Sequence, residues 1–237
     1  MYHSITFGDK NTWDDWHLIP SSRPVFNPPE PKTKFVDIPG ADWHLDLSAS
    51  LTGDIAYNGR KGTFEFIVDN GYGEWYRRYS EILEYMHGQV LRAVLEDDPT
   101  HYYEGRFWID SWKSQPQNSR IVIEYNVAPY RYEQSTSLED WYWDDFNFET
   151  GVVREYSGIR VDGSRSFIIP GDRMWVTPSF IVKSDDGKGV NVSFDGMSYN
   201  LPDGNSRVVT LRLGPGLNTL IFTGHGTVSI EYRGGTL

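Results

Sequence analysis

Three residue types that bind metals alternate in one short stretch of the sequence: Asp42, His44 and Asp46. Two carboxylates and an imidazole on one face of an extended chain could hold zinc or another divalent cation. The residues that alternate with them are apolar: Trp43, Leu45 and Leu47. This alternation is typical of an ordinary strand with one solvated face, and short motifs of this kind often match by chance. The stretch therefore predicts a strand over residues 42–47, and we do not expect a metal there.

The sequence contains no other motif that is typical of a catalytic, metal-binding or phosphate-binding site. The segment KSDDGKG at 183–189 lacks the ligand spacing of a calcium loop and predicts a hairpin turn. The six histidines form no zincin motif, and neither a Gly-x-Ser-x-Gly elbow nor a phosphate-binding glycine loop follows a predicted strand. The 33 acids single out no carboxylate pair of the kind a glycosidase needs. We expect no catalytic residue, cofactor or metal, and a glycoside hydrolase is the weakest alternative.

Carbohydrate binding is a more serious alternative, because aromatic residues make up 15% of the chain. The candidate contacts with a sugar are Trp175, Tyr199 and His225. The competing interpretation is that the rings fill a core or a subunit contact. Tyr232 shares its face with Val228 and Ile230, so we expect it to point inward.

The elements that would position these residues are mostly strands. In the first half, alternation predicts strands over 63–68 and within 89–99, 102–112 and 120–132. One helix is predicted over 73–87, because Trp75, Tyr79, Ile82 and Met86 recur every three or four residues. The proline-rich stretch 26–40 suits neither a helix nor a central strand, so it should run extended along a surface or across a neighbouring subunit.

The second half predicts short strands and turns. Asp195-Gly196 suits a type I′ hairpin turn, and further strands are expected at 208–213, 218–222 and 228–232. The glycines at 224, 226, 234 and 235 are expected to mark turns or exits from the sheet. Even spacing favours an antiparallel sandwich or jelly roll. We expect domains at 1–133 and 151–237, with an acidic, aromatic boundary segment at 134–150.

Charge and composition limit the classes of partner and the kinds of cross-link that we expect. The formal net charge of −11 disfavours nucleic acid as a bound partner. The absence of cysteine excludes disulfides and thiolate metal sites. The first thirty residues contain Asp9, Asp14 and Asp15 and no apolar run, so we expect no secretory signal, no membrane association and folding in the cytoplasm.

The order of several motifs is similar to a known family. They are SITFGDKNTWDDWHLIPSSRPVFNPPEPKTKFVDIPGAD, LDLSASLTG, YNGRKGTFEF, VLEDDPTHYYEGRF and the final EYRGGTL. Together they resemble the distal tail protein (Dit) of long-tailed, non-contractile bacteriophages. The resemblance implies a mainly β protein with one helix, made of a sandwich or split-barrel ring domain and a C-terminal galectin-like jelly roll.

The resemblance also implies a function without catalysis. It implies a hexameric ring at the tail tip or baseplate of the virion, assembled in the host cytoplasm, with DNA as passing cargo. Its partners would be the tail-tube protein, a tail-associated hub or lysin protein and receptor-binding proteins. A carbohydrate-binding module, or a hub whose second domain binds host wall saccharide, stays open as the alternative.

Overall fold

The computed structural model describes residues 2–50, 53–68, 75–113, 119–138 and 156–237. The chain divides into two compact units, 1–131 with Leu237 (unit 1) and 132–236 (unit 2). The regular elements of the described residues are one helix and a set of strands, so the prediction of a mainly β protein with one helix is confirmed.

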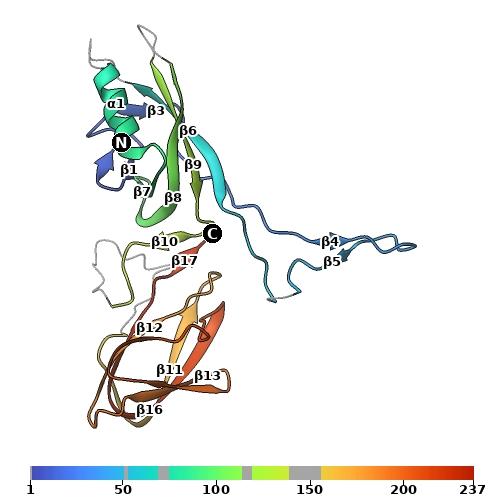
Figure 1. Cartoon of the computed structure of the whole chain (residues 1–237), viewed down its shortest axis with the longest axis vertical. Coiled ribbons are helices and arrows are strands. Elements are labelled where there is room, and N and C mark those ends of the chain that lie inside the picture. The colour runs from blue at the N-terminus through green and yellow to red at the C-terminus, as the bar shows by residue number, and fades with distance from the viewer. Residues whose placement is uncertain (1, 51–52, 69–74, 114–118, 139–155) are drawn as a thin grey trace. The chain divides into compact units, whose positions relative to one another are not determined.

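Unit 1 is built on an antiparallel sheet with the strand order β2-β1-β7-β8-β9-β6-β3 (Figure 1). Its strands are β1 (Ile5–Phe7), β2 (Lys10–Asn11), β3 (Leu18–Pro20), β6 (Arg60–Val68), β7 (Gln89–Leu95), β8 (Asp98–Lys113) and β9 (Arg120–Val127). Alternate residues of the long strands are buried, among them Phe66, Phe107, Ile121, Ile123 and Tyr125. The predicted strand over 63–68 and those within 89–99, 102–112 and 120–132 are therefore all present.

Helix α1 (Trp75–Met86) covers part of this sheet, against β7 and β8 (Figure 1). Ile82 and Met86 are fully buried, while Tyr79 and Trp75 pack against the ring of Trp112. The helix ends at Met86, and the chain turns at Gly88, whose φ of 77° is a backbone conformation that glycine adopts without strain. The apolar stripe in the sequence thus predicted the helix, and the described part lies within the expected 73–87.

Unit 2 contains a six-stranded antiparallel sheet, ordered β14-β13-β16-β12-β15 with β11 paired to β16. Its strands are β11 (Ile159–Gly171), β12 (Ser179–Ser184), β13 (Val190–Phe194), β14 (Met197–Leu201), β15 (Gly204–Arg207) and β16 (Gly216–Glu231). The core lies on one side of the sheet and includes Val161, Phe180, Val192, Leu220, Phe222 and Val228. Two further short strands, β10 (Arg131–Glu133) and β17 (Gly235–Thr236), pair with each other.

The hairpin at Asp195-Gly196 has the predicted geometry. These two residues join β13 to β14, and both have positive φ, 48° and 74°. A type I′ turn requires positive φ at both central positions, and its twist matches that of the flanking strands. The local sequence therefore determined this turn.

The expected pair of strands at 218–222 and 228–232 is wrong in one respect, because β16 runs unbroken through both. Gly224 and Gly226 lie inside this strand instead of marking a turn between two strands. A Cβ at Gly226 would meet the carbonyl oxygen of Lys183 at 2.5 Å, so this glycine permits a close approach of β12. A glycine inside a strand is a known sign of such an approach.

The expected strand at 208–213 is also wrong. Its alternating Leu211 and Leu213 are buried, but the chain there makes only an isolated bridge between Leu213 and Val176. The free edge of β12 pairs instead with the polar run of β15, where Ser179 lies opposite Arg207. Backbone hydrogen bonds complete an edge whatever the side chains are, so apolar alternation is a poor guide to edge strands.

Most of the predicted boundary segment, residues 139–150, lies outside the described residues. Just before it, Ser137 is buried and donates its hydroxyl hydrogen bond to the carbonyl oxygen of Ile230, at 2.8 Å. The backbone N–H of Tyr232 in turn donates to Ser137 Oγ. Within the described part of the chain, no helix is long and apolar enough to cross a bilayer.

Candidate interaction surface

Between β3 and β6, the chain of unit 1 leaves the sheet in a long segment and then returns to it. Residues 28–58, here called the arm, carry the two-stranded ladder of β4 (Phe35–Val36) and β5 (Leu45–Asp46), away from the sheet (Figure 1). Backbone hydrogen bonds continue this ladder toward the sheet, from Lys32 N–H to Ala56 O and from Asn58 N–H to Glu30 O, both 2.8 Å. The two limbs of the arm are therefore paired near its root as well as in the β4–β5 ladder.

The arm has no core of its own. Of the seventeen large apolar side chains that are exposed among the described residues, six fall within 35–47: Phe35, Val36, Ile38, Trp43, Leu45 and Leu47. Val36 and Leu45 are directly opposite in the ladder, so they share a face. Trp43 is 76% exposed although it is the largest of the six. Such a concentration of exposed apolar groups marks an interaction site more often than an ordinary surface.

The root of the arm is held by a polar clamp. The N–H of Asn27 donates to the hydroxyl oxygen of Tyr125 at 2.9 Å, and its side-chain amide donates to Lys61 O at 2.8 Å. Arg60 begins the returning strand, is 5% exposed, and donates to the carbonyl oxygens of Asn27 and Pro129. Both limbs of the arm are thus bonded to each other and to the sheet.

Aromatic packing fixes the same root. The Phe26 ring stacks on Tyr103 with 3.9 Å between centroids and meets Phe64 and Tyr125 edge-on. The Arg60 guanidinium lies over Tyr103, 5.4 Å from the ring centroid, a favourable cation–π arrangement. The arm therefore leaves the sheet from a base that is buried and held by several hydrogen bonds and ring contacts.

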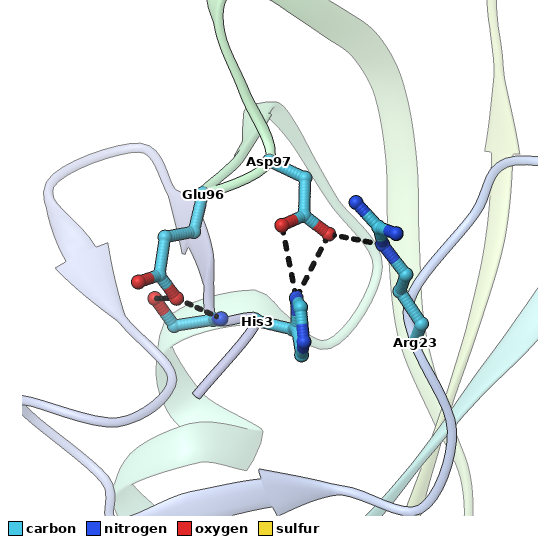
Figure 2. Close-up of polar contacts among 5 residues, drawn as sticks. His3, Arg23, Glu96 and Asp97 are labelled. Atoms are coloured by element: carbon cyan, nitrogen blue, oxygen red, sulfur yellow. Dashed lines mark hydrogen bonds and ion pairs between the residues drawn. The ribbon is translucent and has the colours of Figure 1, made fainter. Parts of the chain in front are cut away.

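A carboxylate cluster anchors the segment that leads into the arm. Figure 2 shows Asp97, in the turn between β7 and β8, bonded to His3 Nδ1 and to Arg23 Nε, the latter at 2.7 Å. The neighbouring Glu96 accepts hydrogen bonds from the N–H and hydroxyl of Ser4. One tight turn thus holds both the first residues of the chain and the stretch just before Phe26.

These contacts lower the pKa values of two carboxyl groups at this turn. The hydrogen bond from Arg23, followed by that from His3, lowers the pKa of the Asp97 carboxyl below its usual value. The next residue, Asp98, also has a lowered pKa, chiefly because of its hydrogen bond with His101 and also because Arg131 lies 2.8 Å away. A lowered folded-state pKa means that both carboxylates stabilise the fold when ionised and lose this contribution as the pH falls.

The residues first considered as metal ligands lie on the arm. Asp46 accepts hydrogen bonds from the N–H and hydroxyl of Ser48, and the His44 ring lies against Trp43 and Phe35. No group of three metal-binding side chains was found among the described residues. The predicted strand at 42–47 is reduced to the two residues of β5, and its apolar face is exposed because no third strand or core covers it.

The three predicted sugar contacts do not form one group. The Tyr199 hydroxyl accepts a hydrogen bond from Thr210, and Tyr199 pairs with the buried Val192, so it faces the core side. His225 lies on the opposite face of the sheet, where its Nδ1 is 2.7 Å from Asp162 Oδ1. Trp175 is 45% exposed and lies where a Cβ on Gly214 would touch its ring.

Comparisons with known proteins point to one architecture. No family model matches the sequence, and no curated protein matches it. Among solved structures, the Dit protein of SPP1 matches over 100% of both chains, with a TM-score of 0.65 and 12% sequence identity. The fold is that of SPP1 Dit. That protein is described as a paradigm of the hub adsorption apparatus in phages that infect Gram-positive bacteria.

The Dit fold confirms the predicted fold class and the resemblance that the motif order suggested. Sequence reasoning identified the arm from its prolines but missed its root. Asn27, Arg60 and Tyr125 are far apart in sequence, and nothing in their local patterns indicates that they meet. The structure explains the glycine at 62, because a Cβ there would collide with the Tyr125 hydroxyl and the Asn27 amide.

Proposed function

We propose that this chain is a structural hub subunit of a phage tail tip, and that it assembles into a hexameric ring through the arm. The ring would connect the tail tube to a tail-associated hub or lysin protein and to receptor-binding proteins, with DNA passing through its centre. The proposal assigns no catalytic step to the chain. It places the protein in the virion, after folding and assembly in the host cytoplasm.

The observation that carries the proposal is the arm itself. A hairpin with six exposed apolar side chains leaves apolar surface in contact with water, and a partner that covers this surface is bound more favourably for it. The bonded root means that little further ordering is needed when the arm docks, which lowers the entropic cost of association. A ring of identical subunits offers each arm the same surface of its neighbour. The Dit fold of the whole chain supports the same role.

Light scattering coupled to size exclusion tests the proposal directly. We expect a closed ring of about six subunits and, by negative-stain microscopy, a particle with a central hole. Replacing Trp43 and Leu45 together by serine should shift the protein to monomers. A control variant, Val209→Ser with Leu217→Ser, removes two exposed apolar side chains of unit 2, each 76% exposed, and should keep the ring. A wild-type protein that stays monomeric at high concentration contradicts the proposal.

A further inference from the structure

Part of the outward face of the unit 2 sheet consists of uncharged side chains. Strand register puts Asn191, Thr223 and Ser164 side by side in one row across β13, β16 and β11. The next row consists of Ser193, Ile221 and Ser166. Phe222, between the two rows on β16, is fully buried, so its neighbours at 221 and 223 point away from the core. These six residues are here called the uncharged face.

On β14, the residues that lie next to the uncharged face are uncharged as well. Asn200 lies opposite Asn191 and donates its side-chain amide to Asn191 Oδ1 at 3.1 Å, while the hydroxyls of Ser193 and Ser198 are 3.1 Å apart. On β11, two residues beyond Ser166, Ile168 is 56% exposed. The face thus combines amides and hydroxyls with aliphatic groups, in a chain whose formal net charge is −11.

This chemistry excludes several kinds of partner. Nucleic acid needs cations to neutralise its phosphates, and the face has none. The six residues themselves carry no charge that would attract a cationic or an anionic partner. The centre of a protein interface is enriched in aromatic residues, methionine and arginine and depleted in serine, whereas three of the six residues here are serine and none is aromatic.

An uncharged polymer with hydroxyl groups on its edges and C–H groups on its faces does match. We propose that the uncharged face binds a neutral polysaccharide, with Asn191, Thr223 and the serines exchanging hydrogen bonds with hydroxyls. Ile221 and Ile168 would contact the C–H faces of the sugar rings. At one end, the exposed pair of His225 and Asp162 offers a carboxylate as a further acceptor.

Affinity electrophoresis in gels containing dextran, mannan, galactan or amylopectin tests this assignment. At least one neutral polymer should slow the wild-type protein. In that gel, the double variant Asn191→Asp with Thr223→Glu should weaken the retardation at least about tenfold, a loss of about 1.4 kcal/mol. Asn205→Asp with Val209→Glu adds the same charge at exposed positions of unit 2 outside this face, so it should stay retarded.

Two outcomes overturn the assignment: no polymer slows the wild type, or the two double variants are slowed equally. Circular dichroism verifies that both variants are folded. The assignment is independent of ring formation, because it concerns unit 2 and not the arm. Light scattering on the same variants separates the two proposals, since neither double variant alters an arm residue. A wild-type protein that is retarded in the gel but forms no ring would contradict only the hub proposal.

Discussion

The arm and the β13–β14 hairpin are both two-stranded antiparallel ladders with alternating apolar residues, yet they are stabilised differently. In the hairpin, Val190 and Val192 are fully buried against β16. In the arm, Val36 and Leu45 are 38% and 47% exposed. A two-stranded ladder is marginal in water by itself. The hairpin is therefore stabilised by its own unit, whereas the arm depends on its bonded root and on whatever covers it.

The largest expected effect comes from removing a buried ring on β16, the strand that pairs with this hairpin. Phe222→Ala should destabilise unit 2 by about 3–5 kcal/mol, because the lost contacts leave a cavity in the core. Trp43→Ala removes a larger ring from the arm but should change the unfolding free energy of the dissociated monomer by less than about 0.5 kcal/mol. Urea unfolding followed by circular dichroism measures both. A comparable loss in the two variants would mean that the arm is packed in the monomer.

A smaller effect is expected at the turns of the two ladders. Gly196→Ala puts a side chain at a φ of 74°, and we expect it to lower the stability of unit 2 by about 1–2 kcal/mol. Gly40→Ala creates the same kind of strain at the arm, where φ is 84°. Because the arm adds little to the unfolding of unit 1, its urea midpoint should not move. A clear shift for Gly40→Ala would contradict the comparison.

The smallest effect depends on pH. The pKa of Asp97 is lowered in the folded protein, so its stabilising contribution is present above the unfolded pKa of about 4 and is lost as the pH falls. Asp97→Asn should therefore reduce the urea midpoint of unit 1 near neutral pH, with a difference that shrinks below about pH 4.

The matched control for this pH dependence is on the arm. The pKa of Asp46 is also lowered, in this case by the hydrogen bonds from Ser48. Asp46→Asn should nevertheless leave the unfolding of unit 1 unchanged at every pH, because the exposed arm is not part of the cooperative core. An equal pH-dependent loss in the two variants would show that the arm unfolds together with the sheet.

Local patterns in the sequence predicted the features whose cause is local. The stripe that buries Ile82 and Met86 predicted α1, and Asp195-Gly196 predicted the hairpin turn. Features that depend on distant partners were missed. The pairing of β15 with β12 has no apolar signal, and the meeting of Asn27, Arg60 and Tyr125 joins residues up to 98 positions apart. The exposure of the arm could not be predicted either, since alternation does not reveal whether a core exists to receive it.

The long strand β16 has a consequence for the order of events during synthesis. β11, β12 and β13 all pair with β16, yet all three emerge from the ribosome before it. The β13–β14 hairpin can close early, because its contacts are local. The edges of β11 and β12 that await β16 stay open until residues 216–231 have been made, and open edges favour aggregation. The interval before β16 emerges is therefore the period in which the nascent chain most needs protection by chaperones.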